Sequence, residues 1–179
     1  MDIQAAQQDT RRAYVGGGPG VLASAMVWFS AGLVERAHGT APAFIVLFFA
    51  GMLIFPLGTL ISRIGFRTAG ASAGNPLGGT ALESTVAMIG GLVAAWLFLP
   101  LKATWVFPVA AIAVGTHYAA FRTVYGDWLF LLLAALITGL GLAGVFAPAV
   151  LGHSLIFGVA SAELVLGVIL TVRAVRAGV

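Results

Sequence analysis

Six long apolar runs, separated by short polar turns, dominate the sequence and predict six membrane-spanning helices. A helix needs about 20 mostly apolar residues to cross the hydrocarbon core of a bilayer, and each run reaches or nearly reaches this length. Only the connection from Arg63 to Gly79 is long enough to form a substantial loop. The predicted spans are residues 19–35, 41–62, 80–101, 104–121, 128–146 and 150–172.

The second run contains a proline that predicts a break in its helix. Pro56 lies in the inner third of this run. Proline has no backbone N–H and its ring clashes with the preceding turn, so it kinks or ends a helix. A carbonyl freed in this way at membrane depth must find another partner or line a wet space.

The composition supports one membrane domain and excludes a soluble enzyme. The chain is 60% hydrophobic and only 8% charged, whereas soluble domains carry about 25% charged residues. Its 24 glycines suit closely packed transmembrane helices. The lack of cysteine excludes disulfides and thiolate metal sites. We therefore predict an all-α fold, in which residues 1–179 form a single compact bundle of six transmembrane helices.

The basic residues are divided unequally between the two ends of the predicted spans. Two of the nine, Arg36 and Lys102, fall on one side. Because cytoplasmic loops carry the excess of Lys and Arg, both termini are predicted to be cytoplasmic. The opening residues lack the basic start of a signal peptide, so no removable signal is predicted. The seven residues on the side of the termini are Arg11, Arg12, Arg63, Arg67, Arg122, Arg173 and Arg176.

Glu163 is the clearest ionisable residue at membrane depth. It lies near the middle of the sixth predicted span, in the sequence GVASAELVLG. A charged side chain there costs about 2.5–3.5 kcal/mol on insertion scales, so it needs a partner or a function. The small residues around it predict that it faces other helices. Both a functional carboxyl and a hydrogen-bonded packing carboxyl remain open.

The fourth predicted span carries a group of polar residues near its cytoplasmic end. Tyr118, Arg122 and Tyr125 have the spacing i, i+4, i+7 and share a helix face. His117 points about 100° away from Tyr118, and its depth is close to that of Glu163. A histidine and a carboxylate at one depth can relay protons or bind a cation. A neutral, hydrogen-bonded His117 is the alternative.

Glu83 lies one turn inside the third predicted span, on the same side as Arg122. The two residues are candidates for an ion pair between the third and fourth helices. Glu83 is alternatively explained by the preference of acidic residues for a helix N-terminus. No metal-ligand spacing, haem-ligating pair at one depth or buried lysine is present in the sequence, so no cofactor and no metal are predicted.

Two segments of the sequence stand out as motifs, NPL at residues 75–77 and GTHYAAFRTVYG at residues 115–126. In both, the chain resembles a family of small bacterial integral membrane proteins of unassigned function. The similarity covers nearly the whole chain. It implies a location in the bacterial inner membrane, and it marks Asn75, Pro76, His117 and Tyr125 as family positions. It implies no activity.

Three functions remain open. The first is a small transporter or channel-like protein with a polar cavity that faces the cytoplasm. The second is a structural or assembly subunit of a larger membrane complex, in which polar residues only hold helices together. The third is an intramembrane enzyme that acts on lipid, although no catalytic motif supports an enzyme. The residues of the expected cavity are Glu83, His117, Tyr118, Arg122, Tyr125 and Glu163.

The expected partners follow from the same properties. Membrane lipids must surround the predicted spans. No nucleic acid is expected, because no basic stripe or recognition motif occurs in the sequence. A second copy of the chain and a different membrane protein both remain open as partners.

Overall fold

The computed structural model describes residues 1–178 and is all-helical, with no strand among these residues. This confirms the predicted all-α class. Five helices are long and apolar enough to cross a membrane, or six if one bent pair counts as a single span. The five are α2 (Gly18–His38), α5 (Leu77–Leu97), α7 (Val106–Tyr125), α8 (Leu129–Phe146) and α10 (Ser154–Arg176).

The second predicted span corresponds to the bent pair, α3 (Thr40–Gly51) and α4 (Ile54–Leu60), which continues into a π-helical turn to Gly65. The axes of the two halves differ by 44°. The break at Met52 and Leu53 lies one turn before Pro56, because the proline ring collides with the carbonyl four residues earlier. The proline thus breaks the helix upstream of its own position.

Short elements complete the chain. The turn before α7 is tight, with Ala103–Trp105 forming a 3₁₀ helix. Gly152 has a φ of 43° and ends the segment before α10. Helix α10 therefore begins at Ser154 and runs through the arginines at its end, about one turn later than the apolar run predicts. The short helices are α1 (Ile3–Ala13), α6 (Leu99–Lys102) and α9 (Pro148–Leu151).

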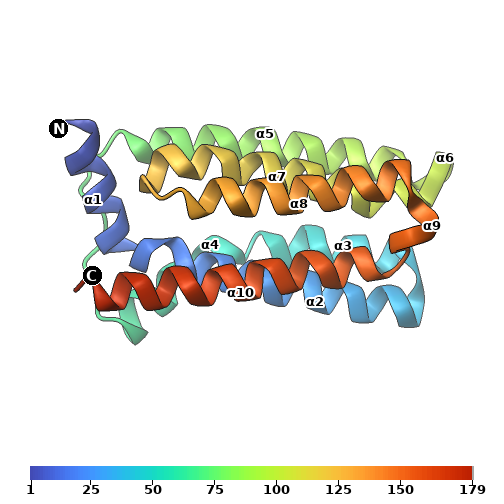
Figure 1. The fold of residues 1–179 in the computed structure, drawn as a ribbon, viewed down its shortest axis with the longest axis horizontal. Coiled ribbons are helices and arrows are strands. Elements are labelled where there is room, and N and C mark those ends of the chain that lie inside the picture. The colour runs from blue at the N-terminus through green and yellow to red at the C-terminus, as the bar shows by residue number, and fades with distance from the viewer. Residues whose placement is uncertain (179) are drawn as a thin grey trace.

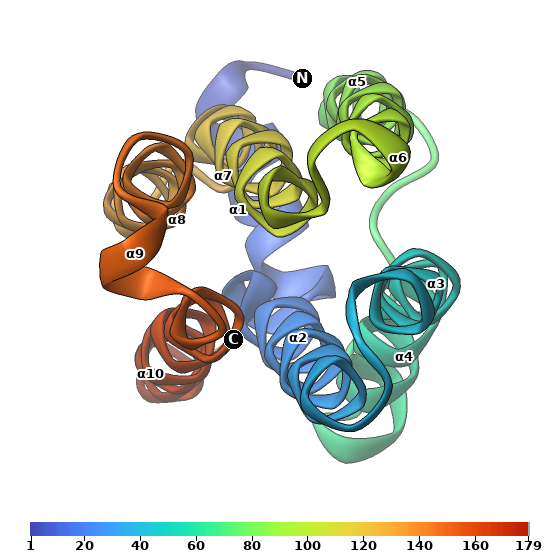
Figure 2. The ribbon, with the colours of Figure 1, turned by 90° about the vertical axis from the view of Figure 1, so that its right-hand side faces the viewer.

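The long helices form two layers of three (Figure 1). In one layer α7 lies between α5 and α8, and in the other α2 lies between α10 and the bent pair α3–α4. Contacts between α8 and α10 join the layers along one edge, as the end-on view in Figure 2 shows. Both termini lie at the same end of the long axis, and α1 crosses the bundle there (Figure 1).

Glycines allow α2 and α10 to approach closely. A Cβ at Gly18 would lie 2.6 Å from the backbone nitrogen of Thr171, and a Cβ at Gly32 would lie 2.8 Å from the ring of Phe157. Helices that approach this closely gain dispersion energy along their whole contact, which drives helix association in lipid. This tight seam positions the buried side chains of α10 against α2.

Candidate functional site

Glu163 lies in the middle of α10 and is 0% exposed. Its neighbours Ala160 and Gly167 are also buried, so the α10 face that carries the carboxyl is lined by small residues and lies close to α2. Because the side chain is surrounded by protein, its polar atoms depend on partners supplied by neighbouring helices. The sequence prediction that Glu163 faces other helices agrees with this position.

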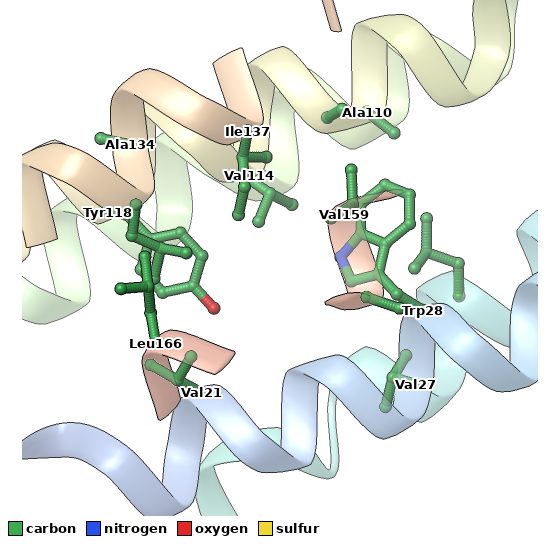
Figure 3. Close-up of a cluster of buried hydrophobic side chains, with 14 of the residues drawn as sticks. Val21, Val27, Trp28, Ala110, Val114, Tyr118, Ala134, Ile137, Val159 and Leu166 are labelled. Atoms are coloured by element: carbon green, nitrogen blue, oxygen red, sulfur yellow. The ribbon is translucent and has the colours of Figure 1, made fainter. Parts of the chain in front are cut away.

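Two hydroxyl groups hold one oxygen of Glu163. The Ser24 hydroxyl of α2 and the Tyr118 hydroxyl of α7 each donate a hydrogen bond to Oε1, both at 2.9 Å. In Figure 3, Tyr118 directs its hydroxyl from α7 into the space between the layers, toward α2. The carboxyl therefore connects three helices, α2, α7 and α10.

The other oxygen of Glu163, Oε2, is buried and has no hydrogen-bond partner among the described residues. A carboxyl bound in this way can take up or release a proton at Oε2 while both hydrogen bonds to Oε1 remain. The strength of those bonds changes with protonation, because hydrogen bonds to an ionised carboxylate are about twice as strong as neutral ones. Proton exchange at Glu163 would thus alter how firmly α10 is held to α2 and α7.

His117 faces a different neighbour from Glu163. Its ring nitrogen Nδ1 is hydrogen-bonded to the hydroxyl of Ser84 on α5. The imidazole packs edge-on against Phe121, with ring centroids 4.4 Å apart. Adjacent positions on a helix point about 100° apart, so His117 turns toward α5 while Tyr118 turns toward α10. His117 and Glu163 therefore do not bond to each other, although both lie beside Tyr118.

Tyr125 belongs to an aromatic cluster at the end of α7. Its ring stacks on Phe130 of α8 with centroids 4.9 Å apart, and Phe121 packs edge-on against both rings. Tyr118 stacks on the same Phe130. The cluster lies between Tyr118 and the end of α7. It fills the space there with rings.

Glu83 and Arg122 are both exposed, and they do not form the ion pair that was predicted from their position on the same side of the membrane. Ser84 is the residue of this turn of α5 that contacts α7. Glu83 precedes it by one position and so points about 100° away. Both charged side chains lie on the outer surface of the bundle.

Asn75 fastens α1 across the end of the bundle. Its amide nitrogen donates to the Ala6 carbonyl at 2.9 Å and to Oδ2 of Asp9 at 2.8 Å, and its Oδ1 accepts from the backbone of Leu77. Pro76 is the residue before the first turn of α5. These two residues therefore position α1 and start α5, rather than lining the site around Glu163.

The carboxylate of Asp9 is stabilised by the same contacts. Hydrogen bonds from the side chain of Asn75 and from the backbone of Ser72 lower the pKa of Asp9 below its usual 3.8. Arg12, further along α1, also lowers this pKa by its charge. Asp9 is thus ionised when α1 is docked.

The polar contacts of Ser24, Ser84 and Glu35 are among those that were not predicted from the sequence. Ser24 and Ser84 were missed because serines are common in membrane helices and one sequence does not show which helices are neighbours. The third contact joins Glu35, near the end of α2, to His153, just before α10, with 2.6 Å between Oε2 and Nδ1. Glu35 is almost fully buried. An acidic residue at the end of an apolar run needs a polar partner, and this need could have indicated the contact from the sequence.

Of the six residues expected to line one polar cavity, none lines the groove beside Arg173 or the apolar pocket beside Trp96. The polar cavity itself stays a prediction. Only Tyr118 and Glu163 bond directly to each other. Residues 1–178 also contain no group of three histidine, aspartate or glutamate side chains that could hold a metal ion.

A comparison with protein families assigns the chain to a family but indicates no activity. A family described as of unknown function, DUF7010, matches residues 3–173. The chain belongs to DUF7010. The match confirms the expectation of an uncharacterised family, and it runs from α1 through the position of Glu163 in α10. No curated protein and no solved structure matches the chain.

Proposed function

We propose that this DUF7010 protein is a small proton-linked transporter or channel-like protein, in which Glu163 takes up and releases the proton. One observation carries the proposal: a fully buried carboxyl joins three helices through Oε1 and keeps Oε2 without a partner. Ionisable residues inside membrane spans are costly and mark ion or proton pathways in many membrane proteins.

The proposal includes six crossings of the bacterial inner membrane with both termini in the cytoplasm. Large apolar side chains on the outside of the bundle support it, such as Phe55, Leu82 and Val165, which are 69%, 65% and 57% exposed. Soluble monomers rarely present apolar patches of this extent. The shared end of the two termini fits an even number of crossings (Figure 1), and the distribution of arginines along the sequence supports the proposed orientation.

The proposed mechanism couples proton exchange to helix packing. When Glu163 is ionised, the bonds from Ser24 and Tyr118 hold α10 firmly against α2 and α7, and when it is protonated they weaken. A group that changes the relative stability of two packings shifts the population between them. Arg122, exposed near the end of α7, attracts anionic groups to the cytoplasmic end.

A second candidate, a structural subunit of a larger membrane complex, is favoured by one observation. Glu163 lines neither the groove beside Arg173 nor the apolar pocket beside Trp96. In this case, the carboxyl only holds helices together. Loss of stability on mutation without any loss of proton movement would then be the result.

Proton flux into liposomes separates the two functions. The full chain is reconstituted with an internal pH-sensitive dye, and a potassium diffusion potential drives proton entry. We expect flux in the unmodified protein and its loss in Glu163→Gln, because glutamine keeps an oxygen for both hydroxyls but cannot carry the proton. The matched control is Glu83→Gln, which removes an exposed carboxyl and should leave the flux unchanged.

Two results would reject the transporter. One is equal proton flux in Glu163→Gln and the unmodified protein. The other is no flux above empty liposomes for the unmodified protein, combined with a lowered melting temperature of Glu163→Gln. That second result supports the structural subunit.

A further inference from the structure

A groove of about 580 Å³ lies at the end of the bundle that holds both termini. Its walls come from the C-terminal turns of α10, the turn before α8 and the end of α1. None of the residues proposed for proton exchange lines it. The polar side chains of the wall are those of Arg11, Asp127, Trp128, Arg173 and Arg176.

The groove has an excess of positive charge. The residues that line it carry three guanidinium groups, those of Arg11, Arg173 and Arg176, and one carboxylate, that of Asp127. Arg173 is paired with Asp127 at 3.3 Å, which leaves the charges of Arg11 and Arg176 without a carboxylate partner among the described residues. Two uncompensated cations beside one cavity favour an anionic ligand.

The arginines are held in place by the fold. Nη1 of Arg11 donates to the carbonyl of Tyr125 at 2.6 Å, which anchors this guanidinium in the wall of the groove. One such bond uses one of its five N–H donors. The bond of Arg173 to Asp127 orients the second guanidinium. A planar guanidinium with free N–H groups matches the geometry of phosphate oxygens, to which it can donate two parallel hydrogen bonds.

The remaining wall is apolar, and this property distinguishes a lipid from a free anion. Leu170 and Ala174 of α10 line the groove and are buried, and Trp128 lines it and is 58% exposed. Trp favours the level of the head groups in a bilayer. A free phosphate ion gains nothing from such a wall, whereas the glycerol and the first methylenes of a lipid bury against it.

We propose that this groove binds the phosphate group of an anionic phospholipid of the cytoplasmic leaflet. Arg11, Arg173 and Arg176 contact the phosphate oxygens, and Trp128 and Leu170 contact the glycerol and the upper acyl chain. The site rests on the proposed membrane orientation, which places this end of the bundle at the cytoplasmic surface. It does not depend on proton transfer by Glu163.

Native mass spectrometry of the full chain in detergent tests the site by counting bound lipids. The probes are phosphatidylglycerol, zwitterionic phosphatidylcholine and inorganic phosphate. The unmodified protein should retain phosphatidylglycerol in preference to phosphatidylcholine. The double variant Arg173→Gln and Arg176→Gln should lower the affinity for phosphatidylglycerol by about tenfold, because each basic residue near an anionic head group adds several-fold to binding.

A second pair of arginines provides the matched control. Arg63 and Arg67 are exposed, lie on the same predicted side and do not line the groove, so Arg63→Gln and Arg67→Gln together should keep the affinity for phosphatidylglycerol. The single variant Arg176→Gln shows whether a loss of lipid binding is caused by misfolding. This exposed side chain forms no hydrogen bond or ion pair among the described residues, so its replacement should leave the fold intact. It should show a smaller loss of the same kind, with an unchanged melting temperature.

Several results would overturn the proposal. They are equal retention of the two lipids, unchanged phosphatidylglycerol affinity in the double variant, or an equal loss in the control pair. Displacement of phosphatidylglycerol by inorganic phosphate at the same concentration would show that the groove binds a free anion. Because lipid binding is measured in detergent without a proton gradient, its failure is distinguishable from failure of the proton-flux experiment.

Discussion

Asn75 shows how one side chain can position a whole helix. Its amide group contacts the Ala6 carbonyl and the Asp9 carboxylate of α1, and it also holds the start of α5 through Leu77. The resemblance of the NPL segment to a known family marked Asn75 as a family position, but it did not indicate which residues Asn75 contacts. The structure supplies a physical reason for an amide there, because its NH₂ group donates to two acceptors of α1 while its oxygen accepts from the backbone of α5.

Docking of α1 should depend on the charge of Asp9. Because contacts in the folded protein lower its pKa below 3.8, the carboxylate stabilises docking fully at pH values above 3.8, and this contribution is lost as the pH falls through the lowered pKa. A spin label on Ala5→Cys, an exposed position of α1, should therefore be immobile at neutral pH and become mobile only in strong acid. The natural absence of cysteine makes the labelling specific.

Two variants make this experiment specific to the Asp9–Asn75 contact. In an Asn75→Ala background the label should already be mobile at neutral pH. In an Asp9→Asn background its mobility should not change in acid. A label that responds to acid equally in the Asp9→Asn background would show that another group controls α1.

The directions of single side chains were partly predictable. Helical geometry correctly placed His117 and Tyr118 about 100° apart, and the small residues around Glu163 correctly predicted that it faces protein. Their partners Ser84 and Ser24 could not be predicted. Identifying them requires knowing that α7 lies beside α5 and that α10 lies beside α2, and neither periodicity nor composition encodes which helices are neighbours.

The contact between α2 and α10 depends on glycines, which have no Cβ. We expect Gly18→Ala to destabilise the protein by about 2 kcal/mol, because its Cβ would lie 2.6 Å from the backbone of Thr171 and force the helices apart. Thermal unfolding in detergent would measure the loss. Backbone atoms of α10 cannot rotate away as a flexible side chain can.

Gly90 in α5 is the matched control for this variant. Nothing lies within 4 Å of a Cβ built at this position, so Gly90→Ala should leave the stability unchanged or raise it by up to about 1 kcal/mol through helix propensity. If both variants lower the melting temperature equally, the effect does not come from the contact between α2 and α10.

The helices themselves were largely predictable, since the length of an apolar run determines a helix that can span a membrane. Their ends were less predictable. The break in the second apolar run lies at Met52 and Leu53, ahead of Pro56, because the steric effect of a proline ring falls on the preceding turn. Helix α10 starts about one turn late because Gly152, with a positive φ of 43°, interrupts the helical backbone before Ser154.

The arrangement of the helices determines which parts of the proposed site can work together. The layer of α5, α7 and α8 contributes Tyr118, and the layer of α10, α2 and α3–α4 contributes Glu163 and Ser24. The proposed proton site therefore joins the two layers, and a change in the protonation of Glu163 would act directly on their contact. The groove proposed to bind lipid lies at the end of the same α10, next to the turn into α8.

The six membrane crossings with both termini in the cytoplasm are the claim on which the transporter and the lipid site both depend. Ala69, in the loop before α5, and Ala103, in the 3₁₀ turn before α7, form a matched pair of exposed alanines at opposite ends of the proposed bundle. Each is replaced by cysteine in the naturally cysteine-free chain and treated with a membrane-impermeant maleimide on intact spheroplasts. We predict that Ala103→Cys reacts from outside and that Ala69→Cys reacts only after permeabilisation. Reaction of both from the same side, or the reverse pattern, would contradict the account.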